Sequence, residues 1–244
     1  LADYWIINLN PHAAFQYKEY YLKVGFDMAL STEPSWGNDT IKTTRFHFFP
    51  DIEARLNIVP NIFAIYARFD GGIYHDNYYK NIEENPYLSN ELRLGFIDQK
   101  SRFYLGLQTS ISRSLTIGAG ASFAFYGALP YFISDTAQLF NYKDTALFIG
   151  NTYTIIYDKS KVLNAHFDMN YKYKDMLNLG LNIDYNHFIT SENLLKPWYK
   201  PALEIKLDAQ YVLLKKFVFK LGFDIDAFMY RPEFIENNVG YIAM

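Results

Sequence analysis

Ten stretches of this chain alternate strictly between apolar and polar side chains, and this alternation limits the folds that the chain can adopt. In residues 20–30, one face carries Leu22 and Phe26, whereas the other face carries Lys23 and Asp27. A period of two residues is typical of a β-strand whose faces meet two different environments. The pattern recurs, with no charged residue in any apolar row, in residues 5–17, 46–56, 63–73, 103–111, 115–125, 163–171, 177–185, 203–211 and 217–227. The sequence therefore predicts an all-β protein.

Two properties of these stretches favour lipid as the environment of the apolar face. They span about ten to thirteen residues each, whereas soluble strands average about five to six and outer-membrane strands need roughly nine to eleven. Aromatic side chains, which suit the headgroup level of a membrane, stand at the ends of the rows. These are Trp5, Tyr17, Tyr20, Tyr171, Tyr185 and Tyr211. A soluble β-sandwich or a lipocalin-like barrel is the alternative, but the apolar side chains of ten rows are too many to be buried around one small cavity.

The connections between the stretches alternate in length. Short turns lie near residues 17–20, 59–61, 112–114, 172–175 and 213–216, and long segments lie at 32–43, 75–101, 127–161 and 189–201. Outer-membrane barrels have short periplasmic turns and long outer loops. We therefore predict a transmembrane antiparallel up-and-down β-barrel in a Gram-negative outer membrane. Complete barrels begin and end in the periplasm, whereas here the first stretch would begin outside and the last would end outside. We therefore expect residues 1–244 to be a single barrel region that is incomplete at both ends.

Composition and spacing argue against several other classes of protein. The net charge is -3 and the basic residues are scattered, so nucleic acid is not an expected partner. The chain has no Cys and no recognisable metal-ligand spacing, so we expect neither a metal nor another cofactor. His166 with Asp168, and His47 with Asp51, are possible acid–base pairs, but no nucleophile motif accompanies them. The sequence does not predict an enzyme.

Charged side chains occupy the faces that would line the barrel lumen. The lumen-lining candidates are Arg45, Asp51, Glu53, Arg55, Arg68, Asp70, Glu204, Lys206, Asp208, Lys220, Asp224 and Asp226. Such residues can hold a plug or line a solute path. Alternatively, opposite charges on neighbouring strands satisfy each other and stiffen the wall. Acidic groups outnumber basic ones here, which favours a cationic or neutral solute.

Glycines recur at inward positions of the strands that follow the short turns. They are Gly25, Gly118, Gly180 and Gly222. Glycine within a strand marks a bend or a close approach by another group. We expect either curvature of the wall there or packing of lumen rings, such as Tyr66 and Tyr104, on the bare backbone.

The long segments are rich in aromatic and amide side chains. The candidates for ligand capture by these outer loops are Trp36, Tyr78, Tyr79, Trp198 and Tyr199. Tyr and Trp are enriched at interfaces, so this composition fits recognition of a glycan or a protein. Alternatively, the loops pack on one another and on the sugar headgroups of lipopolysaccharide.

A family resemblance rests on three segments, FFPDIEARLNIVPNIFAIYARFDGGIY (48–74), NPYLS (85–89) and WYKPALEIKLDAQYVLLKKF (198–217). They resemble the C-terminal barrel region of bacteroidete TonB-dependent-receptor-like outer-membrane proteins. The resemblance implies a receptor or transporter for a nutrient or other ligand, with a plug domain as partner. The alternative function is a non-transporting barrel subunit that scaffolds an outer-membrane complex. Outer-membrane lipid, lipopolysaccharide and other envelope proteins are the expected partners.

Overall fold

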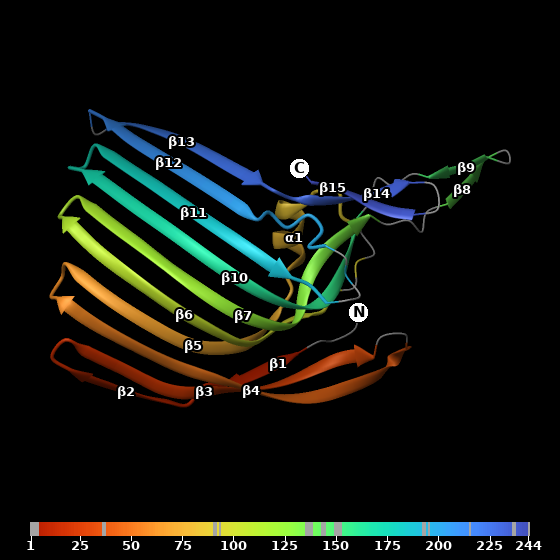
Figure 1. Ribbon diagram of the computed structural model, residues 1–244, viewed down its shortest axis with the longest axis horizontal. Coiled ribbons are helices and arrows are strands. Elements are labelled where there is room, and N and C mark those ends of the chain that lie inside the picture. Colours follow the sequence, from red (N-terminus) through yellow and green to blue (C-terminus); the bar gives the residue numbers. More distant parts are fainter. Residues whose placement is uncertain are drawn as a thin grey trace.

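The computed structural model describes residues 5–35, 38–89, 94–134, 139–142, 145–148, 153–191, 196–214, 216–235 and 238–243, with Leu92 and Leu194. Within these residues, eleven strands form one antiparallel sheet, in which the first two strands both pair with the third and each later strand pairs with the next strand of the sheet along the chain (Figure 1). The strands are β1 (Ile6–Leu9), β2 (His12–Tyr17), β3 (Tyr20–Ser35), β4 (Asn38–Val59), β5 (Phe63–His75), β6 (Phe96–Ser112), β7 (Leu115–Ser134), β10 (Tyr153–Tyr173), β11 (Leu177–Ile189), β12 (Leu203–Leu213) and β13 (Phe217–Ala227). This up-and-down order confirms the predicted fold class.

Three further elements lie outside the main sheet. They are the hairpin of β8 (Leu139–Tyr142) and β9 (Thr145–Phe148), the hairpin of β14 (Tyr230–Ile235) and β15 (Asn238–Ala243), and helix α1 (Tyr78–Glu84). All three lie at the end of the sheet that carries the long connections, which we call the loop end (Figure 1). The opposite end, with the short turns at the predicted places, is the turn end. Among the described residues, no helix is long and apolar enough to cross a membrane.

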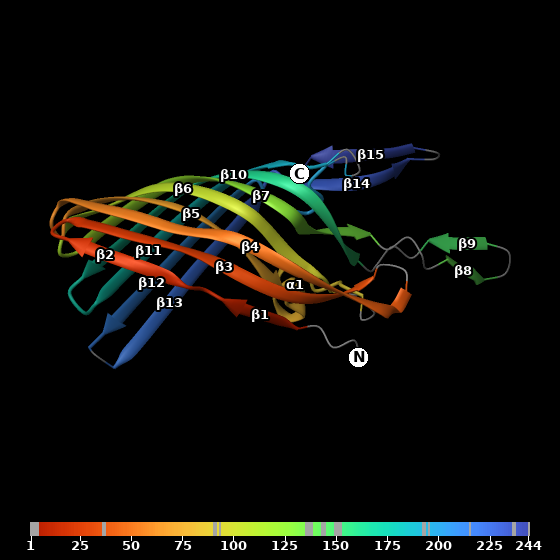
Figure 2. The same cartoon turned by 90° about the horizontal axis from the view of Figure 1, so that it is seen from below.

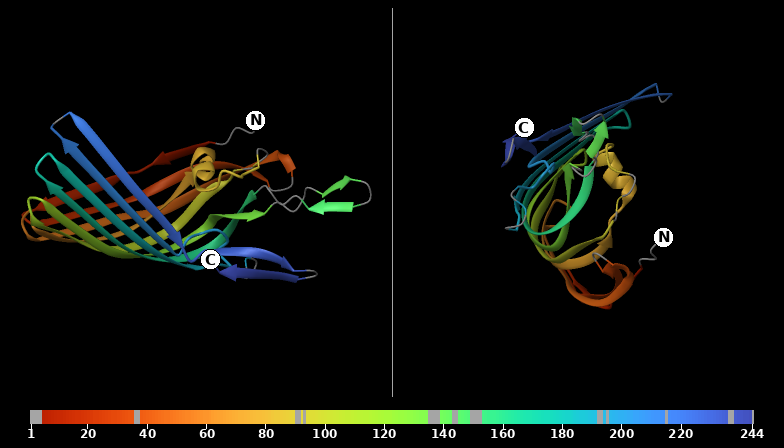
Figure 3. Two further views of the ribbon diagram at one scale, coloured as in Figure 1. Left: turned by 90° about the horizontal axis from the view of Figure 1, so that it is seen from above. Right: turned by 90° about the vertical axis from the view of Figure 1, so that its right-hand side faces the viewer.

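The main sheet curves into an open arc. Strands β1 and β2 both pair with β3 at one edge, β13 forms the other edge, and no described strand joins the two edges. Figure 3 shows the arc from its end, and Figures 2 and 3 place α1 on its concave side. The concave face carries the polar rows and is called the inner wall below. The convex face carries the apolar rows.

The strands differ in length from the sequence prediction of about ten to thirteen residues. Strands β4, β7 and β10 contain 22, 20 and 21 residues, so they extend into segments that were predicted as loops. The pairing of β7 with β10 shifts between Asp158 and Ser160. Such a bulge interrupts the alternation on which the prediction relied. Residues 5–17 form two short strands, because Pro11 lacks the N–H that a continuous ladder requires.

The convex face is a broad exposed apolar surface. Phe46, Phe103 and Leu221 are 63%, 55% and 58% exposed, although they lie on different strands. Contiguous apolar surface of this kind marks contact with lipid or another protein. Buried side chains gather instead toward the loop end. One such cluster joins Ala29, Phe49, Ile73 and Phe96.

Candidate functional site: the inner wall

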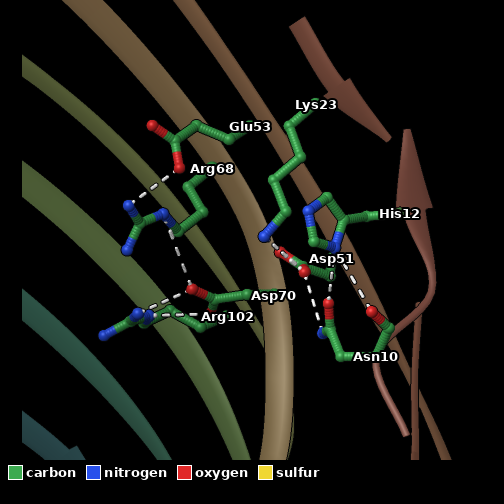
Figure 4. A network of polar contacts seen from close by, with 8 residues as sticks. All are labelled: Asn10, His12, Lys23, Asp51, Glu53, Arg68, Asp70 and Arg102. Atoms are coloured by element: carbon green, nitrogen blue, oxygen red, sulfur yellow. Dashed lines mark hydrogen bonds and ion pairs between the residues drawn. The ribbon is translucent and has the colours of Figure 1, made fainter. Parts of the chain in front are cut away.

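Ion pairs connect neighbouring strands along the first half of the inner wall (Figure 4). Glu53 of β4 lies directly opposite Arg68 of β5, and the guanidinium Nη2 donates to Glu53 Oε2 at 3.0 Å. On the other side of β4, Lys23 Nζ lies 2.6 Å from Asp51 Oδ2. The strict alternation of β3, β4 and β5 places these groups on one face, and the register places them side by side.

The strongest of these contacts joins β5 to β6. Arg102 donates to both carboxylate oxygens of Asp70, from Nε at 3.0 Å and from Nη2 at 2.7 Å. Gln99 Nε2 donates to the same carboxylate at 3.2 Å. The Asp70 and Arg102 side chains are only 16% and 35% exposed. A two-pronged charge-assisted contact of this kind fixes geometry as well as contributing energy. Arg102 was absent from the candidates because the sequence does not show which residue of β6 lies opposite Asp70.

In the second half of the inner wall, fewer of the carboxylates are paired with basic side chains. Glu204 of β12 lies between Asp184 of β11 and Asp226 of β13 in the ladder. Lys206 approaches Glu204 at 3.8 Å and lies opposite Asp224. The remaining candidates here, Asp208 and Lys220, are exposed on the same face. The wall formed by β11 to β13 therefore carries an excess of carboxylates.

The two remaining basic candidates lie on β4. Arg45 is exposed in the part of β4 nearer the loop end. Arg55 is exposed near the turn end, where its Nε donates to Oδ1 of Asn57 at 3.2 Å. Arg55 lies opposite Tyr21 and Tyr66 rather than opposite a carboxylate.

Three aromatic rings form a stacked ladder on the inner wall. Tyr66 and Tyr104 stack with centroids 5.3 Å apart, and Tyr104 and His166 stack with centroids 5.4 Å apart. The Tyr104 hydroxyl lies 2.9 Å from the Tyr66 hydroxyl and 3.0 Å from His166 Nε2. The rings cover Gly106 and Gly120, where a Cβ would overlap them. The rings therefore lie directly on the backbone, in the space that side chains at these two positions would occupy.

Tyr66 and Tyr104 thus pack on bare backbone, but at glycines other than the four identified from the sequence. The four glycines identified from the sequence meet other neighbours. Gly25 faces His12, and Gly118 faces Asp168. At Gly180 and Gly222 the nearest atoms are 3.7 and 3.6 Å from an added Cβ. Only the register of β5, β6, β7 and β10 reveals which glycine lies beside which ring.

The outer-loop candidates differ in exposure. Trp198 is 5% exposed and packs against Tyr131 and Leu194, whereas Tyr79 on α1 is 78% exposed. Tyr199 is partly buried, with its ring edge-on to Tyr153 at 5.0 Å. Tyr78 is adjacent to Tyr79 on α1, with ring centroids 6.3 Å apart. Trp36 lies outside the described residues.

A hydrogen-bonded latch fixes α1 to the strands. Asn77 caps the helix by accepting from the Tyr79 N–H at 2.9 Å. Just before it, Asp76 accepts from the Tyr157 hydroxyl at 2.5 Å, and that hydroxyl accepts from the Gly95 N–H at 2.8 Å. Burial, together with the contact to Asp76, raises the pKa of Tyr157, so the phenol stays protonated and keeps donating.

The segments around α1 and around residue 200 also contact each other. Lys200 Nζ lies 3.1 Å from Glu84 Oε2, and the same ammonium lies 5.2 Å from the Phe132 ring centroid. The long loops therefore pack on one another, as the alternative interpretation of their aromatic content proposed. In the described part of the chain, no three His, Asp or Glu side chains form a group that could hold a metal ion.

The fold of this chain was compared with those of known proteins and matches several solved structures. No family model and no curated protein matches the chain. The structure of the FpvAI–pyocin S2 complex matches with a TM-score of 0.61 and 12% identity, over 98% of this chain and 30% of that one. The siderophore receptor PiuA from Acinetobacter baumannii matches with a TM-score of 0.55 and 11% identity, over 93% and 34%. The outer membrane transporter YddB from Escherichia coli matches with a TM-score of 0.54 and 10% identity, over 98% and 37%.

The fold is that of outer-membrane β-barrels. The matches confirm the predicted location in the outer membrane at the level of the fold, and they support the resemblance to outer-membrane receptors and transporters at the same level. The bacteroidete lineage of the resemblance stays a prediction. The chain spans about a third of the length of these solved chains, at 30%, 34% and 37%.

Proposed function

We propose that this chain forms part of the wall of an outer-membrane receptor or transporter that takes up a nutrient or another ligand. The observation that carries the proposal is the contrast between the two faces of one curved sheet. The convex face is apolar and exposed, whereas the concave face carries cross-strand charge pairs such as Arg68 with Glu53. This is the arrangement of a barrel with lipid outside and a polar path inside. The structures that share the fold include a siderophore receptor and a copper transporter.

We propose that residues 1–244 belong to a single barrel region. In lipid, unpaired backbone groups of a sheet edge cost several kcal/mol each, so the edges formed by β1, β2 and β13 require partner strands. We propose that additional strands pair with these edges and complete the barrel. Lipid and lipopolysaccharide would then surround the convex face, and a plug or another envelope protein would occupy part of the concave side.

The candidate residues take different roles in this proposal. The inner-wall charges line the path or hold the plug, and the carboxylate excess on β11 to β13 favours a cationic or neutral solute there. Tyr78 and Tyr79 belong to the surface that captures ligand, and Trp36, which lies outside the described residues, stays a candidate for the same role. Trp198 and Tyr199 hold the loop in place through their buried contacts. We propose no enzymatic role, since the structures that share the fold include receptors and transporters.

Substituted-cysteine labelling tests the proposal, because the chain has no Cys of its own. Asp208 and Leu207 are adjacent on β12 and point to opposite faces. We expect a membrane-impermeant maleimide to label Asp208→Cys in outer-membrane vesicles from at least one aqueous side. Leu207→Cys, the matched control, should stay unlabelled. An Asp208→Cys thiol that no aqueous reagent reaches from either side would refute a transport path and favour the scaffold function.

A further inference from the structure

Arg55 differs from Arg68 and Arg102 in that it has no carboxylate partner among the described residues. Arg68 and Arg102 each contact an acidic side chain within 3.0 Å. Among the described residues, no ion pair reaches Arg55, and its one hydrogen bond goes to the neutral amide oxygen of Asn57 at 3.2 Å. The cause is the register, which places Arg55 between two tyrosines on neighbouring strands.

The hydrogen bond to Asn57 leaves the two terminal amino groups of the Arg55 guanidinium available. It uses only the Nε of Arg55. The two terminal amino groups form a planar fork that matches the two oxygens of a carboxylate. The residue is exposed on the inner wall. Arg55 is therefore oriented by its own strand and keeps donors for a further partner.

A hollow of about 490 Å³ lies beside Arg55 at the turn end of the sheet. It lies between the turn that carries Lys18 and Glu19 and the turn around Asn61, with Gln108 on its wall. Its volume falls within the usual range for small-ligand sites. Backbone hydrogen bonds hold its sides, since the Asn57 N–H donates to the Glu19 carbonyl at 2.9 Å. The hollow is thus a preformed feature of the turn end.

The charges around the hollow favour an anion. Lys18 and Arg55 are basic and Glu19 is acidic, and Glu19 makes no ion pair with Arg55 among the described residues. The Lys18 ammonium lies 5.3 Å from the Tyr17 ring centroid. A single net positive charge beside neutral amide donors suits a carboxylate.

We infer that this cavity, the Arg55 hollow, is a binding site for a carboxylate group. The carboxylate comes either from a small solute in the lumen or from an acidic side chain of a polypeptide segment that lies against the inner wall. In both cases the guanidinium fork of Arg55 supplies the main contact and Asn57 holds the fork in place. The inference goes beyond the proposed function, because a scaffold barrel could contain the same site.

Arginine modification by phenylglyoxal tests the site in the full protein. The rate at each arginine is measured by mass spectrometry of peptides, with succinate as the probe and chloride at equal ionic strength as the control. For a solute site, Arg55 reacts faster than Arg102, and succinate slows Arg55 by a factor of 1 + [L]/Kd, about tenfold at roughly ten times the Kd. The Arg102 rate should not change.

Two variants separate the local site from the general charge of the lumen. Lys220→Gln removes a basic group elsewhere on the inner wall and should leave the succinate protection of Arg55 unchanged. Asn57→Ala removes the partner of Arg55 Nε and should raise the succinate concentration for half protection by about twofold to tenfold, the equivalent of one hydrogen bond. Equal protection by succinate and chloride, with a reactive Arg55, would overturn the inference.

A polypeptide source gives a different result. Arg55 would then be unreactive in the untreated protein, and a zero-length carbodiimide would join the amine of the Arg55→Lys variant to an Asp or Glu side chain. Mass spectrometry of the cross-linked peptide identifies that side chain. An unreactive Arg55 without such a cross-link also overturns the inference.

Discussion

The assignment of lipid to the convex face can be tested by the same substitution at two adjacent residues of β11. Leu181 belongs to the apolar row and lies between Met169 and Leu207 of the neighbouring strands. Asn182 belongs to the inner wall and lies between Asp168 and Lys206. Arginine at either position adds the same side chain and the same charge, so only the environment differs.

The position of Leu181 in the apolar row sets the expected cost. It lies four residues from both Leu177 and Tyr185, the ends of that row. Four residues correspond to about 13 Å along the strand, or about 10 Å along the membrane normal at a tilt of about 40°. The apolar band is about 25 Å tall, so Leu181 lies near its middle, where arginine costs about 2–4 kcal/mol. This cost lowers the ratio of folded to unfolded protein by about 30-fold to 700-fold.

The control substitution should cost far less. Asn182 is exposed on the polar face, and an arginine there meets the Asp168 carboxylate, so we expect a change within about 1 kcal/mol. Equilibrium unfolding of the full protein in lipid vesicles, followed by heat-modifiable gel mobility, measures both variants. Equal destabilisation by Leu181→Arg and Asn182→Arg, or a larger effect at Asn182, would refute the assignment of lipid to the convex face.

Three further predictions concern the inner wall and the latch. A double-mutant cycle on Asp70 and Arg102 should give a coupling energy of about 1.5–3 kcal/mol, and a value near zero would contradict the paired geometry. Tyr157→Phe should accelerate hydrogen exchange in residues 76–95, because the latch loses its central hydroxyl, while exchange in the central strands stays unchanged. Gly120→Ala should cost about 1–3 kcal/mol, because its Cβ would lie 2.5 Å from a tyrosine hydroxyl of the ladder. Gly180→Ala, with its nearest atom at 3.7 Å, is the control, and equal urea midpoints for the two variants would argue against the ladder.

Much of the strand order could be predicted because strands joined by a short turn pair with each other. The alternation within residues 203–211 and 217–227 identifies two strands, and the short connection between them makes the strands antiparallel neighbours. The lengths of β7 and β10 were underestimated because a bulge near Ser160 changes the face of every residue beyond it. Helix α1 was not predicted, since its seven residues carry no sustained helical period and its stability depends on contacts with the strands.

The sequence predicted which face of the sheet carries the candidate residues, but it did not predict which of them pair. Alternation indicates that Glu53, Arg68 and Asp70 share the inner wall, and the structure places the three within one network. It does not indicate that Arg102 reaches Asp70, because that contact depends on the register between β5 and β6. Exposure could not be predicted either. Trp198 and Tyr79 are both aromatic residues of long connecting segments, yet Trp198 is buried and Tyr79 is exposed.

The sequence by itself determined which side chains lie on the apolar face and which on the polar face, because a strand has a period of two residues and each row keeps one chemical character over its length. It also determined where the chain reverses, through its short polar turns. The tertiary structure decided which charges pair and which glycines the aromatic ladder covers, and it leaves Arg55 without a carboxylate partner among the described residues. These outcomes depend on the register between strands, where a shift of one residue exchanges every partner. For that reason the Arg55 hollow could be found only after the strands were aligned.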